Sequence, residues 1–383
     1  MDVKSESIQS VAWLSGQIES AVKEHGSVEP LLQIFSFFAP SGLPARLLFS
    51  QQAAFPEPLS ALPDSEWSRL FEVLDSFGLI IRGRSEVFLL VDVQESVRDG
   101  LDQAACRHWT RVGIDVITFL SEKGGITRLD ELNRLAWHTA TLAGWALEVG
   151  LVDQLSALLK VLDREGHLLI DYWPERAVLS HRRGIQLCRV IQGEDHPGVG
   201  IRINNLGEAW HRLGDYSRAD HYFQKALAHF KSKLGDGHQL VANALGNLAL
   251  LRRDQKRLDE AANYFQSALS LLDKEHGLDN RVVNLCVNGL GRIIRSQQGA
   301  KPAIDFLKGV LLNALQRGNL KPHPYIAMIY NNMGILQLEI GENGPAKESV
   351  TIAMKIAAKS LPKNHPQFQQ IYANYKKFST KTG

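Results

Sequence analysis

The sequence is poor in cysteine, has no long apolar run and carries almost no net charge. Its three cysteines, Cys106, Cys188 and Cys286, stand far apart in apolar helical context, which predicts buried free thiols of a reducing compartment rather than a disulfide framework. No apolar run approaches the roughly 20 residues of a membrane-spanning helix. The polar start at Met1 lacks the basic-then-apolar layout of a signal peptide. These shortages predict a cytoplasmic protein that does not enter a membrane.

Recognisable catalytic motifs are also missing. The chain has no Gly-x-Ser-x-Gly elbow, no His-Glu-x-x-His and no Cys-x-x-Cys pair. It has no Gly-x-x-x-x-Gly-Lys-Ser/Thr loop, so backbone amides and a lysine that could cradle a triphosphate are absent. We therefore predict a protein that is not an enzyme, with no cofactor and no metal. A net charge of +2 argues against bulk nucleic-acid binding and leaves room for a local basic patch.

What the chain does have is a pattern that returns every 42 residues in its second half. Ala219, Ala261 and Ala303 open similar strings at this spacing, and Ala346 follows one residue late. The triplet Asn205-Leu206-Gly207 recurs in similar form upstream of each of the later alanines. A polar residue marks each turn between units: His196, His238, Asn280, His323 and His365. Markers that keep one register over this length indicate a helical repeat array.

The register divides the C-terminal part, 152–383, into repeat units. A degenerate first unit is predicted over 152–195, followed by four clearer units and a capping helix. The four units are 198–234, 240–276, 282–317 and 325–361, and the cap is Pro366–Phe378. The predicted fold is mainly α, an α-solenoid.

Small residues explain the spacing of the repeats. We expect close helix approach at one small position of each first helix: Gly207, Ala249, Gly291 and Gly334. The alanines of the second helices do the same, and Phe223, Phe265 and Leu307 fill the layer between units. This pattern resembles the tetratricopeptide repeat in its 42-residue, kinesin-light-chain form, over about half of the chain. The resemblance implies a fold and says little about function.

The N-terminal part is predicted as three further segments. Residues 1–26 contain an amphipathic helix over 5–24. Residues 27–100 read as helix 28–38, a short helix from Pro44 to Phe49, a third helix from Asp64 to Phe77, and strands 79–82 and 87–91 joined by a hairpin. Three helices and a β-wing predict a small winged-helix domain. Residues 101–151 are a helical arm, in which His138 is expected to be packed.

The winged-helix segment resembles that of STAND-type signalling NTPases. The resemblance rests on the Ala39-Pro40 stop, the Phe77-Gly78-Leu79-Ile80 step into the wing, and Val91 to Arg98. The histidine of the family's Met-His-Asp motif, which contacts the nucleotide, would fall on Val91. The resemblance therefore implies a STAND-like, NB-ARC/TPR-type signalling protein that lacks its nucleotide-binding domain.

A winged helix can also read DNA. The third helix would enter the major groove. It carries Glu66, Glu72 and Asp75 against one arginine, Arg69, and phosphate would repel such a face. Packing between domains is the use that this composition favours.

The repeat array offers a concave groove lined by the first helix of each unit. Mapping the tetratricopeptide pattern onto the chain predicts these partner-binding residues: Asn204, Asn205, Glu208, Arg212, Asn243, Asn247, Arg253, Asn288, Arg292, Arg295, Asn331 and Asn332. Asparagine carboxamides both donate and accept, which suits the backbone of an extended peptide, and the arginines favour an acidic one. The alternative is that the asparagines only tie neighbouring helices together.

The sequence thus predicts a non-enzymatic adaptor or sensor module that binds a protein or an extended, acidic peptide. Two alternatives stay open: a transcription regulator that uses the winged helix on DNA with the array as sensor, and the sensor half of a STAND NTPase. The partner's identity and the oligomeric state are undetermined at this level.

Overall fold

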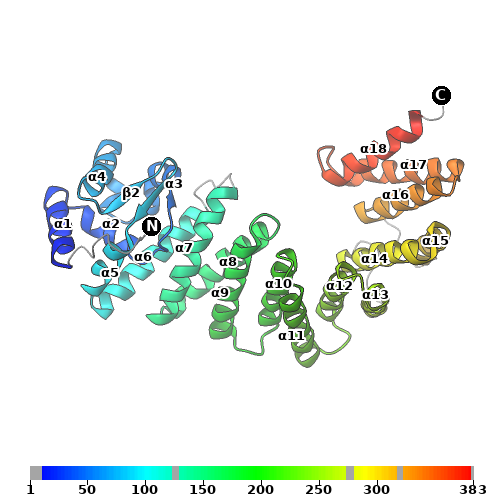
Figure 1. Ribbon diagram of the computed structural model, residues 1–383, viewed down its shortest axis with the longest axis horizontal. Coiled ribbons are helices and arrows are strands. Elements are labelled where there is room, and N and C mark those ends of the chain that lie inside the picture. Colours follow the sequence, from blue (N-terminus) through cyan, green and yellow to red (C-terminus); the bar gives the residue numbers. More distant parts are fainter. Residues whose placement is uncertain (1–10, 123–128, 273–279, 317–321, 381–383) are drawn as a thin grey trace, which may run out of the picture. The chain divides into compact units, whose positions relative to one another are not determined.

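The computed structural model describes residues 11–122, 129–272, 280–316 and 322–380. The chain forms two compact units, Met1–Asp215 and Tyr216–Gly383, which we call unit 1 and unit 2 and describe separately (Figure 1). The four-segment division expected from the sequence stays a prediction. The start of the predicted N-terminal helix, residues 5–10, and the Gly124-Gly125 break in the arm lie outside the described residues.

The N-terminal part of unit 1 alternates short helices with a small sheet. Its helices are α1 (Val11–Glu24), α2 (Val28–Phe35), α3 (Ala45–Ser50), α4 (Asp64–Ser76) and α5 (Val91–Asp99), with short 3-10 turns at Gln52–Ala54 and Leu59–Ala61. Its strands are β1 (Leu43–Pro44), β2 (Ile80–Arg82) and β3 (Glu86–Leu89). α2, α3, α4 and the hairpin lie within one to three residues of their predicted bounds, whereas the sequence analysis did not predict α5 as a helix.

The sheet corrects the sequence prediction in two places. β1 pairs antiparallel with β3, Leu43 opposite Val87, so the sheet has the order β1-β3-β2 rather than being a lone hairpin. Pro44 belongs to this strand and precedes α3 instead of opening it. Val91, expected at the end of the second strand, is the first residue of α5. A two-residue strand has no periodicity to recognise, which is why its pairing was missed.

An aromatic core holds these elements together. Trp67 of α4 is fully buried, packs against Phe55 and Phe71, and donates its indole N–H to the backbone oxygen of Leu48 at 3.1 Å. The end of α2 is satisfied by a side chain from α5, because Gln94 Nε2 donates to the carbonyls of Phe35 and Phe38 at 3.0 and 3.2 Å. Helix ends leave carbonyls without partners, and Gln94 supplies them here.

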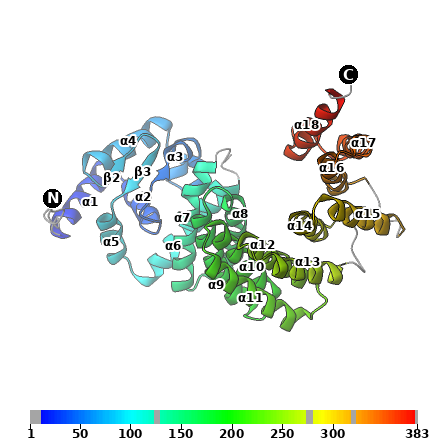
Figure 2. The same ribbon diagram turned by 45° about the vertical axis from the view of Figure 1, so that its right-hand side comes forward.

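The rest of unit 1 consists of helices packed as successive hairpins. They are α6 (Gln103–Glu122), α7 (Leu129–Glu148), α8 (Leu155–Leu169), α9 (Pro174–Gln192) and α10 (Pro197–Arg212), with a 3-10 turn at Val152–Gln154 before α8 (Figure 2). α7 contacts α6, α8 and α9. Arg46 of α3 binds the buried Glu131 of α7 through two hydrogen bonds of 2.5 and 2.6 Å, which fixes the N-terminal elements on the arm.

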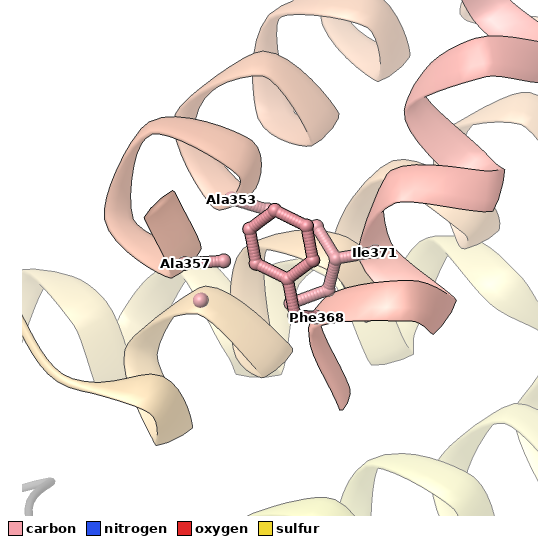
Figure 3. Packing of buried hydrophobic residues seen from close by; sticks show 5 residues of the cluster. Ala353, Ala357, Phe368 and Ile371 are labelled. Atoms are coloured by element: carbon pink, nitrogen blue, oxygen red, sulfur yellow. The ribbon is translucent and has the colours of Figure 1, made fainter. Parts of the chain in front are cut away.

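Unit 2 is an array of helix pairs. Its helices are α11 (Tyr216–Leu234), α12 (Gln239–Asp254), α13 (Leu258–Leu272), α14 (Arg281–Gln298), α15 (Ala300–Gln316), α16 (Pro324–Glu339), α17 (Asn343–Ser360) and α18 (Pro366–Thr380). These agree with the predicted units to within a few residues. The last helix packs as expected, with Phe368 and Ile371 of α18 against Ala353 and Ala357 of α17 (Figure 3).

The polar turn residues have a defined structural use. The imidazole Nδ1 atoms of His238 and His323 accept the backbone N–H two residues on, at 3.1 and 3.3 Å, which caps α12 and α16. Asn280 does the same for α14 with its carboxamide oxygen. His196 and His365 repeat the contact at α10 and α18. The turn histidines are therefore helix N-caps, which satisfy amides that have no partner inside the helix.

Close helix approach is confirmed at one predicted glycine and is not required at another. A Cβ at Gly334 would lie 2.5 Å from Val350 and 3.1 Å from the backbone oxygen of Ala346, so α16 and α17 meet there through small residues. At Gly291 the nearest atom, from Leu307, would be 3.5 Å away, which any alanine tolerates, and that part of the prediction is wrong. The tighter position on α14 is Gly289, which packs directly on the Phe265 ring.

Candidate functional site

The first helices of unit 2 lie side by side. α12 contacts α14, α14 contacts α16, and α16 contacts α18. We call the surface that carries their asparagines the asparagine face, made up of Asn243, Asn247, Asn288, Arg292 and Asn332. Each of these side chains is partly or fully exposed to solvent. Asn243 and Asn247 lie one turn apart on α12, and Asn288 and Arg292 lie one turn apart on α14, so each pair shares a side of its helix.

Hydrogen bonds join neighbouring helices across this face. Asn332 of α16 donates to the carboxamide oxygen of Asn288 on α14 at 2.8 Å, and Asn288 donates to Asn284 of its own helix at 2.8 Å. One repeat later, Asn374 of α18 donates to the oxygen of Asn331 at 2.9 Å. Asn332 does tie neighbouring helices together, as one of the two interpretations of the sequence expected, and for Asn205 and Asn247 that interpretation stays a prediction.

This ladder leaves part of the Asn332 carboxamide unused. A carboxamide has two N–H groups and an oxygen with two lone pairs. Asn332 uses one N–H and makes no hydrogen bond through its oxygen to any described residue. Since Asn332 is only half-buried, its oxygen can accept from a ligand while the ladder stays intact.

Two predicted asparagines are buried instead of lining a surface. Asn331 is fully buried, and Asn204 in α10 of unit 1 is 5% exposed. They stand at the position preceding Asn332 and Asn205, one residue around the helix, where the side chain points between helices. The prediction that Asn204 and Asn331 line a partner-binding surface is therefore wrong, because buried side chains do not reach a ligand.

The predicted arginines differ in how far they are already neutralised. Arg295 pairs with Glu339 at 2.7 Å and Arg253 with Asp254 at 2.8 Å. Arg292 is exposed and makes no ion pair or hydrogen bond with any described residue. On the asparagine face, Arg292 is thus the cation with most capacity for an acidic ligand group.

The remaining predicted residues belong to unit 1. On α10, Asn205 and Glu208 are half-buried and Arg212 is exposed. Arg212 pairs with Asp171 at 3.0 Å and lies 4.0 Å from Glu208, so its charge is largely compensated.

Sequence reasoning missed two members of the ladder. Asn374 stands 42 residues after Asn332, so the repeat spacing itself could have identified it. Asn284 is one turn before Asn288 and is 8% exposed. Its role depends on side-chain direction, which spacing alone does not provide.

Buried ionisable groups occur in unit 1, away from solvent. Burial raises the pKa of Glu165 to about 8, and its Oε1 accepts a hydrogen bond from Thr139 at 2.8 Å. Burial lowers the pKa of His138 to about 4, and likewise that of His181. His138 is fully buried against Phe38, as predicted for the arm. These groups are sealed in helix interfaces, where a substrate does not reach them.

Cysteine and metal predictions can be compared with the described residues. Cys188 and Cys286 are buried free thiols as predicted, whereas Cys106 is only half-buried. Burial raises the pKa of Cys286 to about 12, which makes it inert.

In the described part of the chain, no three histidine, cysteine or acidic side chains gather in a metal-binding arrangement. No helix there is long and apolar enough to cross a membrane.

Comparison with known families and proteins points to the repeats. A family model described as "Tetratricopeptide repeat" matches residues 202–274. The chain is 20% identical over 207 residues to Protein KINESIN LIGHT CHAIN-RELATED 3 of Arabidopsis thaliana, which is 52% of this chain and 31% of that protein. It is 23% identical over 112 residues to KINESIN LIGHT CHAIN-RELATED 1 of the same plant, 29% of this chain and 18% of that one. The chain thus spans less than a third of these curated relatives.

Solved structures with similar repeats are also found. BtubC (BKLC) from P. vanneervenii has 21% identity and a TM-score of 0.42, over 60% of this chain and 87% of that one. A STAND protein with a tetratricopeptide repeat sensor from Pyrococcus horikoshii has 14% identity and a TM-score of 0.44, over 95% of this chain and 49% of that one. At these scores neither structure bears on what this chain does.

Proposed function

We propose that this mainly helical tetratricopeptide repeat protein, related to kinesin-light-chain-like proteins, is a non-enzymatic adaptor or sensor that binds an extended peptide segment of a partner protein. The observation that carries the proposal is the asparagine face of unit 2. There the carboxamide oxygen of Asn332 on α16 has no hydrogen-bond partner among the described residues, and Arg292 is exposed on the neighbouring helix α14. We also propose that the protein binds its partner in the cytoplasm.

An extended peptide fits this face because its backbone groups have no partners of their own. Each residue brings one N–H donor and one C=O acceptor that must be satisfied. Carboxamides repeated on successive helices can provide both kinds of partner. A bond of this kind contributes about 0.5–1.5 kcal/mol net, so several together are needed for useful affinity.

The charge on the face favours an acidic segment. Arg292 supplies a guanidinium without an acidic partner among the described residues, and guanidinium groups bind carboxylates through two parallel hydrogen bonds. Apolar side chains of the ligand would anchor beside Leu250 and Ile335, both half-buried. The charged contribution should weaken as salt rises, since exposed charges are screened over about 8 Å at physiological ionic strength.

A display experiment tests this proposal. Random extended peptides are selected on the full chain, and the recovered sequences are then measured against the double variant Asn332→Ala, Arg292→Glu. We expect acidic sequences with apolar anchors, and a loss of affinity of roughly tenfold or more in the variant.

The matched control is Lys308→Glu, which changes an exposed cation on the outer helix α15 by the same charge. It should leave binding unchanged. If the double variant binds as the parent does while keeping its melting temperature, the asparagine face is not the binding surface.

We also infer that residues 27–100 form a winged-helix module that packs on the arm rather than reading DNA. Two contacts support this role: Arg46 binds Glu131, and the Arg98 guanidinium lies 5.2 Å from the Trp145 ring centre. The exposed charges of α4 are Asp64, Glu72 and Asp75 against Arg69, which opposes phosphate. Retarded migration of random duplex DNA at low salt would refute the packing-only role.

A further inference from the structure

A pocket of about 400 Å³ lies between α7 and α9 in unit 1. Its wall includes Trp137, Glu175, Arg176, Arg182 and Arg183, over a floor formed in part by Val178. Volumes of this size are in the range of small-molecule sites, which begin at roughly 300 Å³. The pocket belongs to different helices from the asparagine face and is independent of it.

The pocket's charge is one-sided. Three arginines face a single carboxylate, Glu175, and none of the three forms an ion pair with any described residue. Concentrating like charges in a concave surface costs stability, because walls of low dielectric focus their field. Burial also lowers the pKa of Arg176 by desolvating its charged form, and the nearby Glu175 carboxylate offsets this only in part. A bound anion would relieve this cost.

Two of the three guanidinium groups, those of Arg176 and Arg183, are held in place by neutral contacts. Arg176 stacks over the Trp137 ring at 4.0 Å and donates Nε–H to Asn133 at 3.1 Å. Arg183 donates to the Gln186 side chain at 2.8 Å and lies over Gly144, where an added Cβ would come within 3.2 Å of it. Arg182 is exposed and makes no hydrogen bond to the described residues. Two oriented guanidinium groups and a third that is exposed, none of them in an ion pair with a described residue, are suited to an oxyanion.

The aromatic wall adds a second requirement. Trp137 is 37% exposed, and the floor around Val178 is apolar. A flat apolar group can pack there while an attached anion reaches the arginines. We propose that this pocket binds a small ligand that carries a phosphate or carboxylate on an aromatic body.

Calorimetric titration of the full chain with phenyl phosphate tests the proposal, with benzoate, inorganic phosphate and phenol as comparison probes. We expect saturable one-to-one binding of phenyl phosphate, and weaker binding of inorganic phosphate and phenol, each of which lacks one of the two features. Benzoate binding on a par with phenyl phosphate would assign the site to aromatic carboxylates as well; its absence would restrict it to phosphates.

Two variants at the pocket, one on α9 and one on α7, are compared with a control variant on α9. Arg182→Gln should weaken phenyl phosphate binding about tenfold or more, since hydrogen bonds to charged groups are the strong ones. Gly144→Ala keeps every charge and displaces only Arg183, and it should also weaken binding. Arg189→Gln, one to two turns further along α9 and outside the pocket, should change nothing.

Three results would overturn the proposal: no saturable binding by the parent, equal binding by Arg182→Gln, or an equal loss in Arg189→Gln. Circular dichroism on each variant separates loss of the site from loss of the fold.

Discussion

The N-terminal part of unit 1 and the repeats of unit 2 are stabilised by different kinds of contact. In the first, each important contact occurs once, as in Trp67 with Leu48 or Gln94 with the end of α2. In the second, one contact recurs, as in the N-caps of α12, α14, α16 and α18. Repeats contact mainly their neighbours, so their stability is a sum of similar small terms. Substitutions should therefore act strongly and locally in the first part and modestly in the second.

The largest effect is expected for Trp67→Ala. Removing a fully buried tryptophan and its hydrogen bond should cost about 3–5 kcal/mol. Hydrogen exchange followed by mass spectrometry should show faster exchange over α2 to α4, and no change over α12 to α14. Trp13→Ala, at a side chain that is 41% exposed, is the control and should cost far less. Equal exchange in both variants would contradict the proposed core.

The next effect depends on pH and concerns Glu165. Its pKa in the folded chain, about 8, lies above the ordinary 4.5, so the folded state holds the proton more tightly. Its contribution to stability is complete below about pH 4.5 and is lost as pH rises through 8. Glu165→Gln should remove this loss, on the order of 2–3 kcal/mol at pH 8 once relaxation is allowed for.

Urea unfolding at acid and alkaline pH measures the difference in the free energy of unfolding between the parent protein and Glu165→Gln. The two proteins should have similar stability at pH 4 and diverge toward pH 8, with the variant the more stable. The buried histidines change stability with pH in the opposite direction to Glu165, and they do so equally in both proteins, so their contribution cancels in the difference. A constant difference across this range would show that Glu165 is ionised in the folded chain.

Within the repeats, Gly334→Ala should cost about 1–3 kcal/mol through overpacking. The added methyl group would meet Val350 and a backbone oxygen of α17 that is unable to move aside. Gly309→Ala is the matched control, because nothing lies within 4 Å of its Cβ position. That change should stabilise by about 0.5–1 kcal/mol, since glycine is unfavourable inside a helix. Melting temperatures that move the same way in both would refute close approach at Gly334.

The smallest effect is expected at a single cap. His238→Ala removes the acceptor for the Leu240 amide and should cost about 1 kcal/mol. His238→Asn should restore most of the stability, because Asn280 already performs this task at the start of α14. If asparagine is as damaging as alanine in chemical denaturation, the histidine acts through something other than the cap.

Most of the helices were predictable from the sequence, and the site was predictable only in part. The apolar spacing and the position of the turn residues located α8 to α18 to within a few residues. The asparagines were recognised as a set, but the neighbouring positions Asn331 and Asn332 differ in burial. A rotation of about 100° per residue separates them, and side-chain patterns alone do not say which one faces outward.

The sequence by itself determined the repeat array, because helix formation, capping and a fixed spacing of small residues are all local properties that recur along the chain. Tertiary structure alone decided three features: the pairing of β1 with β3, the bond from Asn332 to Asn288, and the arginine pocket between α7 and α9. Each joins residues that are about 40 positions apart in the chain. Their meeting depends on the direction of side chains on packed helices and strands, and no local pattern encodes it.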